Sequence, residues 1–257
     1  MSWAALRADA LACHAAALAA VEPGILVRRG LERAGGRIRL RGRGSELLAE
    51  HAGRVLVVGA GKAGLAMARA TAAVLGDACA GGLVIVPHGA AGPCPRGIEA
   101  FPELWQRVVT APHGFFADMP QTGGLGEPSL FLALCAAINA VGHLLFAAGL
   151  RGMIGSFVGQ MVAAFVLAAL LVVVAQNLFE GRAGYEPTFR VVAYAWAPLV
   201  VAWLPFVGSL ALVYSAYLML RGLERIQAQD TTRAALTLVI SLAILWILAR
   251  AGRPIGL

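Results

Sequence analysis

The chain has 257 residues, enough for one large domain or two modest ones. Hydrophobic residues make up 59% of it and charged residues 14%, against roughly 45–50% and ~25% in soluble domains, and both values, averages over two unlike halves, indicate a membrane protein. The net charge of +7 comes almost entirely from arginine. Because neither aromatic partners nor a binding motif accompany these arginines, nucleic acid is not an expected partner.

The first elements of the chain are expected to be one helix and a short strand or hairpin. An Ala/Leu-rich helix is expected over Trp3–Val21, ended by Pro23-Gly24, and it does not resemble a signal peptide. Alternating arginines at 37, 39, 41 and 43 predict the exposed face of a short strand or hairpin, with attraction to anionic lipid as the alternative. The four cysteines (Cys13, Cys79, Cys94 and Cys135) lack the spacing of metal ligands, so neither a metal site nor a disulfide framework is expected.

One βαβ unit is the main feature of the first hundred residues. Val55–Val58 is a continuous aliphatic run, typical of a strand buried on both faces. Glycines follow at once, a helix is expected to about Leu75, and Gly81-Gly82 turns the chain into a second strand, Leu83–Val86. Such a unit predicts part of a parallel, Rossmann-like sheet.

The turn after the first of these strands is a candidate anion site. Gly59, Gly61 and Gly64 let backbone amides approach a phosphate or a substrate anion, and Lys62 adds a charge. Two alternatives stay open, a dinucleotide site and a purely structural role for the glycines. The second strand lacks the acidic residue that a dinucleotide site requires, and Ala63 breaks the Walker A pattern.

The segments Leu6–Ala10, Val55–Gly64 and Gly82–Gly89 together resemble the N-terminal part of MOFRL-type glycerate 2-kinases. The resemblance covers roughly residues 4–100 and implies that Lys62 contacts substrate or phosphoryl group, with ATP and Mg²⁺ as cofactors if the segment is active. His88 stands at the end of the family's second strand, where a structural role is expected of it. The catalytic body of these kinases does not follow, so a truncated and inactive segment is expected.

The composition changes between Ile98 and Leu104. An amphipathic helix is expected from Leu104 to Phe116, before a turn at Gly123–Pro128. It would either lie in the bilayer interface or pack on the end of a helix bundle. His113 and Asp118 lie near each other in sequence, but no nucleophile spacing makes them catalytic.

Five membrane spans are predicted, with four as the alternative. A span needs about 20 apolar residues, and the candidate segments are Leu130–Leu150, Ile154–Val174, Val191–Trp203, Phe206–Leu220 and Ala234–Ala249. The third segment is expected to be kinked at Pro198. The loops that alternate with these spans hold Arg107, then Arg182 and Arg190, then Arg221, Arg225 and Arg233 on one side, which predicts a cytoplasmic N-terminus.

Polar residues within the spans have two interpretations. Asn139, His143 and Gln160, with Gln176 and Asn177 near one end, could line a transport path. No acidic residue accompanies them within the spans, so interhelical hydrogen bonding is the favoured use. Gly155 and Gly159 form a weak small-xxx-small pattern for close helix approach.

The second half also resembles a family. Pro112–Phe116, Gly123–Pro128, Thr188–Pro198 and Leu204–Gly208 are similar to the bacterial branch of the Yip domain family of integral membrane proteins. Eukaryotic relatives bind Rab-type GTPases and act in vesicle trafficking, a role that is not carried over because the cytosolic motifs of that branch are missing. The resemblance implies an all-α membrane domain.

The domain scheme that results is a kinase-like α/β segment over residues 1–100, a linker with an interfacial helix over 101–128, and a Yip-type helical domain over 129–250. We expect a non-enzymatic protein of a bacterial inner membrane, whose partners are the lipid bilayer and further copies or other membrane proteins. The alternatives are a glycerate-binding enzyme fragment, a small transporter, and an artificial joining of two neighbouring reading frames near Ile98–Leu104.

Overall fold

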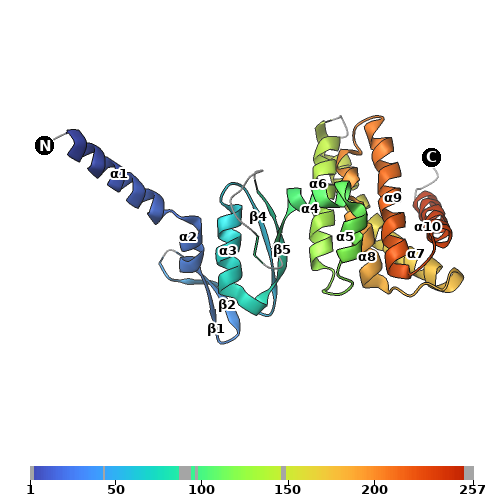
Figure 1. The fold of residues 1–257 in the computed structure, drawn as a ribbon, viewed down its shortest axis with the longest axis horizontal. Helices are drawn as coiled ribbons and strands as arrows, with labels where there is room; N and C mark the ends of the chain where they lie inside the picture. The colour runs from blue at the N-terminus through green and yellow to red at the C-terminus, as the bar shows by residue number, and fades with distance from the viewer. Residues whose placement is uncertain (1–2, 43, 87–93, 96–97, 146–148, 252–257) are drawn as a thin grey trace. The chain divides into compact units, whose positions relative to one another are not determined.

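The computed structural model describes residues 3–42, 44–86, 94–95, 98–145 and 149–251. The chain divides into two compact units, Met1–Pro102 and Glu103–Leu257, called here the first and the second unit (Figure 1). Each is described by itself.

The first unit begins with two helices, α1 (Trp3–Ala20) and α2 (Pro23–Gly30). The expected N-terminal helix is therefore confirmed, and its described side chains are all exposed. Glu22 is the N-cap of α2, because its carboxylate accepts hydrogen bonds from the amides of Gly24 and Ile25 at 3.0 and 2.7 Å. By length and composition, α1 and α2 together also qualify as one bent membrane span.

An antiparallel sheet follows, made of β1 (Leu31–Ala34), β2 (Arg37–Arg41) and β3 (Leu47–Ala52). Arg39 lies directly between Glu32 and Glu50 of the neighbouring strands, and Arg41 bonds Glu32 at 3.0 Å. That hydrogen bond is the main reason why the pKa of Glu32 lies below its usual value. The predicted strand is confirmed, and its arginines at 37, 39 and 41 are paired with acidic side chains of the same sheet.

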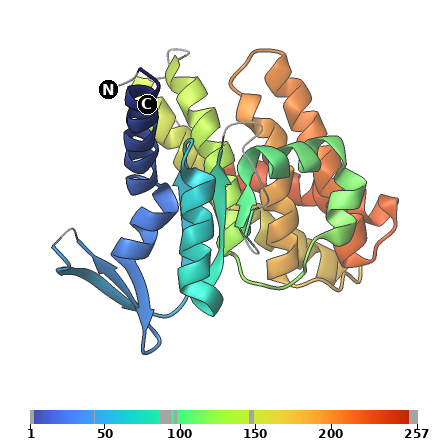
Figure 2. The same ribbon diagram turned by 60° about the vertical axis from the view of Figure 1, so that its left-hand side comes forward.

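A parallel sheet forms the rest of the first unit, in the order β4 (Val55–Ala60), β5 (Cys79–Ile85) and β6 (Ile98–Ala100). Helix α3 (Gly64–Leu75) and the short 3-10 helix η1 (Gly76–Ala78) connect β4 to β5, and Figure 2 shows α3 lying on one face of the sheet. Leu65 and Ala68 of α3 pack there against Val84. The predicted βαβ unit is confirmed, but β5 begins at Cys79, so Gly81 and Gly82 lie inside the strand and not in a turn before it.

The prediction that the first strand is buried on both faces is wrong. Val57 packs against the α3 side, but Leu56 and Val58 alternate to the other face and are 40% and 59% exposed. Residues along a strand point to opposite faces, and the helix that connects β4 to β5 covers one of them. The aliphatic run therefore has one covered face and one exposed face.

Gly82 brings β4 and β5 together. In the parallel register it lies opposite Val57, and a Cβ atom at Gly82 would overlap the backbone carbonyl of Val57. Gly59 in β4 differs, because a Cβ there would meet a Val84 methyl at an ordinary 3.5 Å. Of these two strand glycines, Gly82 is the one that the sheet requires for close packing.

Helix α4 (Phe101–Thr110) begins at the last two residues of the first unit, and α5 (Pro112–Asp118) follows it in the second. These replace the single amphipathic helix predicted from Leu104, because Pro112 cannot continue the hydrogen bonding of α4 and begins a new helix instead. Leu104, Val108, Phe115 and Phe116 are buried. The helices thus pack on the bundle through their apolar side chains, as the second of the two expectations had it.

The bundle itself contains α6 (Gly126–Leu145), α7 (Gly149–Leu178), α8 (Tyr185–Ala195), the 3-10 helix η2 (Ala197–Val201), α9 (Val207–Gln227) and α10 (Thr231–Ala251). Among the described residues, α6, α7 and α10 are each long and apolar enough to cross a membrane. Five spans are not confirmed, because α8 and η2 are short pieces and the apolar part of α9 ends at Arg221. At the expected kink near Pro198 the α-helical turn ends at Ala195 and the chain continues through Trp196 into the 3-10 helix η2.

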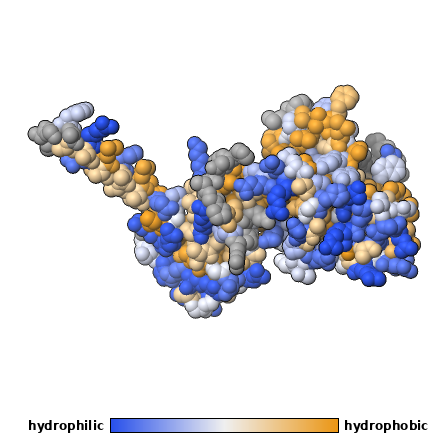
Figure 3. Space-filling view, in the orientation of Figure 1, coloured by the Kyte–Doolittle hydropathy of each residue, from blue (hydrophilic) through white to orange (hydrophobic). Residues whose placement is uncertain are grey.

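The bundle is apolar at its centre and also over much of its outer surface. Every residue from Thr188 to Val200 is buried, so α8 and η2 form the centre. Large apolar side chains point outwards from α7 and α10; Val158, Val162, Val239 and Trp246 are each more than half exposed. In Figure 3 hydrophobic side chains gather over one end of this unit and hydrophilic ones over the other. Exposed apolar surface of this extent is expected of a protein surrounded by lipid.

Candidate functional site

The glycine-rich turn of the first unit joins β4 to α3. Gly61 has a φ of +110°, which favours glycine, and its amide donates to the carbonyl of Ile85 at 2.9 Å. The Gly64 amide donates to the Gly61 carbonyl at 3.0 Å. Two of the amides that were candidates for an anion are thus already used in holding the turn.

Lys62 lies at the tip of this turn and is exposed, one residue before Ala63 caps α3 without a side-chain hydrogen bond. The predicted set Gly59, Gly61, Lys62 and Gly64 is therefore together in space, with Gly59 inside the strand and the others in the turn. The arrangement offers a cation and a helix N-terminus to an anion. His88 lies outside the described residues.

A magnesium–nucleotide centre would need oxygen ligands beside this turn. The first turn of α3 holds no acidic residue. Within the described ranges, no group of three or more His, Cys, Asp or Glu side chains is placed to hold a metal ion. The residues present fit an anion cradle in part and do not fit a metal–nucleotide site.

Side chains of neighbouring helices hydrogen-bond to the backbone where α8 passes into η2, before α9 begins. Four backbone carbonyls of this segment accept hydrogen bonds from side chains: Ala195 from Ser215 Oγ at 2.7 Å, Ala197 from Trp105 Nε1 at 2.8 Å, Leu199 from Asn139 Nδ2 at 2.6 Å, and Val200 from Trp203 Nε1 at 3.0 Å. A broken helix frees carbonyls that lipid cannot satisfy. Three of the donors come from other elements, namely α4, α6 and α9, which ties these helices to the break.

Asn139 is the centre of a wider cluster. Its side-chain oxygen accepts from Gln160 Nε2 at 2.9 Å and from Ser156 Oγ at 3.2 Å, both on α7, while its amide donates to Leu199. Asn139 is 2% exposed. These side chains therefore join α6, α7 and η2 as interhelical hydrogen bonds, which was the favoured interpretation of the polar residues in the spans.

The remaining polar residues of the spans behave differently. Gln176 donates to the carbonyl of Ala183 at 3.1 Å and Asn177 to Val173 of its own helix at 2.7 Å, while His143 is half-buried. Gly155 and Gly159 face outwards, and a Cβ at either position would meet nothing within 4 Å. The small-xxx-small pattern thus does not bring helices together within this chain.

Arginines gather at one end of the bundle, where α8 begins, α9 ends and α10 begins. Among them, Arg190 is 1% exposed and donates to the Gly124 carbonyl at 2.8 Å, while Glu186 accepts from the Gly124 amide at 2.6 Å. Arg190 and Glu186 together hold the Gly124 peptide. The neighbouring Gly123 has a φ of +129°, and a Cβ there would come within 3.0 Å of the Arg190 guanidinium, which explains the paired glycines of this turn.

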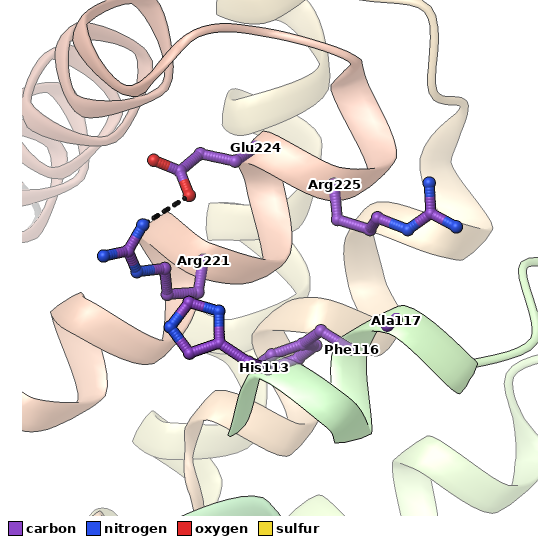
Figure 4. Close-up of a pocket in the computed structure, with 6 residues that line it drawn as sticks. All are labelled: His113, Phe116, Ala117, Arg221, Glu224 and Arg225. Atoms are coloured by element: carbon purple, nitrogen blue, oxygen red, sulfur yellow. Dashed lines mark hydrogen bonds and ion pairs between the residues drawn. The ribbon is translucent and has the colours of Figure 1, made fainter. Parts of the chain in front are cut away.

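A pocket of about 340 Å³ lies between α5 and the last turns of α9 at this end. It is lined by His113, Phe116 and Ala117 of α5 and by Arg221, Glu224 and Arg225 of α9, and we call it the basic pocket (Figure 4). Arg221 donates to Glu224 at 3.0 Å, and its guanidinium lies 5.3 Å from the centre of the Tyr217 ring. In Figure 4 Arg221 and His113 lie at one side and Arg225 at the other.

Comparison with protein-family models matches residues 107–250 to the Yip1 domain. The chain belongs to the Yip1 domain family. A second match, to a domain of unknown function (DUF4147), covers residues 9–135 and overlaps the Yip1 domain over 107–135. A glycerate kinase of Danio rerio is 39% identical over 84 residues, which are 33% of this chain and 16% of that protein. No solved structure matches the chain.

Both resemblances drawn from the sequence are thus confirmed, a Yip1 domain at the C-terminal side and a glycerate-kinase-like segment before it. The basic pocket of the Yip1 domain was not predicted. From the sequence, Arg221 and Arg225 bear on the orientation of the spans, and His113 is a candidate for catalysis alone. The i, i+4 spacing of the two arginines indicated a shared helix face, but nothing in the sequence placed α5 opposite that face.

Proposed function

We propose that the chain is a non-enzymatic integral membrane protein, in which the Yip1 domain organises the surrounding bilayer. The observation that carries the proposal is the apolar outer surface of this domain: the hydrogen-bonded segment from Thr188 to Val200 is buried, while α7 and α10 direct large apolar side chains outwards. Lipid is the partner that such a surface fits. Further copies of the chain are a second partner, for which the outward-facing Gly155 and Gly159 offer a flat contact.

In this proposal α8 with η2 and α9 complete five crossings of a bacterial inner membrane, with the N-terminus in the cytoplasm. The distribution of arginine supports this orientation. Arg182, Arg190, Arg221, Arg225 and Arg233 all belong to the end at which α8 begins and α9 ends, whereas Arg151 stands near the start of α7 and Arg250 in the last turn of α10, away from that end. Positive charge concentrates on the cytoplasmic side of membrane proteins.

Cysteine labelling in intact cells tests this topology. In a variant whose native cysteines are replaced by alanine, Arg151→Cys is expected to react with a membrane-impermeant maleimide. Glu180→Cys, whose side chain is 90% exposed at the arginine-rich end, is expected to react only after the cells are permeabilised. Reaction of both positions in intact cells, or the reverse pattern, would contradict the proposed orientation.

The enzyme alternative rests on Lys62. We expect no ATP-dependent phosphorylation of glycerate by the purified full chain, because the described residues beside Lys62 do not provide a metal–nucleotide centre. The measurement is phosphoryl transfer to glycerate in the presence of Mg²⁺, with Lys62→Ala as the matched variant. Turnover in the parent chain that disappears in Lys62→Ala would overturn the non-enzymatic proposal.

The transporter alternative is less well supported. In transporters, broken helices present free backbone carbonyls and half-helix ends to the substrate. Here the carbonyls of Ala195, Ala197 and Leu199 are occupied by side chains of neighbouring helices. This segment therefore serves to hold neighbouring helices together in this domain.

A further inference from the structure

The charges of the basic pocket do not cancel. Arg221 contributes one guanidinium N–H to Glu224, and its Nε atom has no hydrogen-bond partner among the described residues. Arg225 is exposed and forms no ion pair with any residue that the structure describes. Two guanidinium groups thus face one carboxylate, with the His113 ring of α5 beside Arg221 as a third nitrogen group. An arginine offers five N–H donors in a planar array that suits phosphate oxygens.

The pocket lies where the apolar part of α9 ends. Arg221 follows Leu220 directly, and Tyr214 and Tyr217 stack on each other in the two turns before it, as is typical of a membrane interface. Tyr214 donates to the Val109 carbonyl at 2.6 Å, which fixes α4 beside this part of α9. Leu210 and Val213, one to two turns before Tyr217, are 71% and 70% exposed. A polar pocket is thus continuous along one helix with an outward apolar surface.

We propose that the basic pocket binds the phosphate group of an anionic glycerophospholipid, with the acyl chains along the exposed apolar side chains of α9. This inference rests on the proposed membrane-spanning role of α9. Arg221 and Arg225 supply charge-assisted hydrogen bonds to the phosphate oxygens, and Glu224 holds Arg221 in place. Free phosphate shares this chemistry, but it would make no use of the apolar surface at Leu210 and Val213.

Thermal unfolding of the full chain in detergent tests the proposal, with phosphatidylglycerol, phosphatidylcholine and inorganic phosphate titrated separately. Phosphatidylglycerol is expected to raise the unfolding temperature more than the other two. In the double variant Arg221→Gln/Arg225→Gln, its apparent affinity is expected to fall by about tenfold or more, since each lost charge-assisted bond is worth on the order of a tenfold change. The matched control is Arg182→Gln/Arg233→Gln, which removes the same charge at the same end outside the pocket.

Each alternative outcome overturns the proposal in a recognisable way. Equal stabilisation by inorganic phosphate or by phosphatidylcholine would replace an anionic-lipid site by a general phosphate or lipid effect. An equal loss of affinity for phosphatidylglycerol in the two double variants would show that net charge at this end, and not the basic pocket, determines the affinity. An unfolding temperature that does not change with phosphatidylglycerol, in a chain that shows the proposed labelling at Arg151→Cys and Glu180→Cys, would rule out lipid binding at the basic pocket. The proposed membrane topology would not be affected.

Discussion

Gly82→Ala is expected to destabilise the first unit by about 3 kcal/mol, the upper part of the range for overpacking a close contact. The added Cβ would overlap the Val57 carbonyl, which belongs to the backbone and cannot move without separating β4 from β5. The packing of Leu65, Ala68 and Val84 beneath these strands would be lost with the separation.

The thiol of Cys79, half-buried in β5, reports on this opening. Its labelling rate in the full chain is expected to rise roughly a hundredfold, because each 1.4 kcal/mol corresponds to a factor of ten. Gly59→Ala is the control, since its Cβ has room against Val84. If both variants label at the parent rate, β4 and β5 do not pack as closely as described.

Asn139→Leu is expected to lower the free energy of unfolding of the second unit by about 2 kcal/mol. The change removes the side-chain donor to the Leu199 carbonyl and the acceptor of the Gln160 and Ser156 side chains, and a polar group left without its partner costs about 1–3 kcal/mol. Leu199 keeps a hydrogen bond from the Ala202 amide, and Gln160 keeps its bonds to Ser156, which limits the loss.

Thermal unfolding of the full chain in detergent measures this effect. Asn177→Leu is the matched control on α7, because Asn177 is exposed and bonds within its own helix. Trp105→Phe, which removes the donor to Ala197 and keeps an aromatic ring, should lower stability in the same direction. An Asn139→Leu variant as stable as Asn177→Leu would show that the α8–η2 break does not depend on its side-chain caps.

Local sequence patterns were sufficient to predict the helices and strands that neighbouring residues alone determine. The β4–α3–β5 unit follows from an aliphatic run, glycines and a helical period, and α6, α7 and α10 follow from apolar length. The exposed face of β4 could not be predicted in this way, because the exposure of Leu56 and Val58 depends on which helices cover the sheet.

The same difference between local sequence and tertiary packing applies to the candidate sites. The glycine-rich turn is one continuous segment and was found from its motif. The basic pocket joins His113 to Arg221 and Arg225, and the caps of the helix break come from Trp105, Asn139 and Ser215. Such sites depend on the packing order of helices, which the apolar periodicity of each helix does not specify.

The unequal lengths of neighbouring helices have a consequence for the membrane itself. With 30 residues α7 extends about 45 Å, whereas α8 with η2, Tyr185–Val201, reaches about 28 Å at the rises of the two helix types. A hydrocarbon layer of about 30 Å is close to the second length and well short of the first. In the proposed membrane-spanning arrangement, lipid around α7 therefore thickens or the helix tilts. The domain would then impose a local mismatch that favours some membrane thicknesses over others.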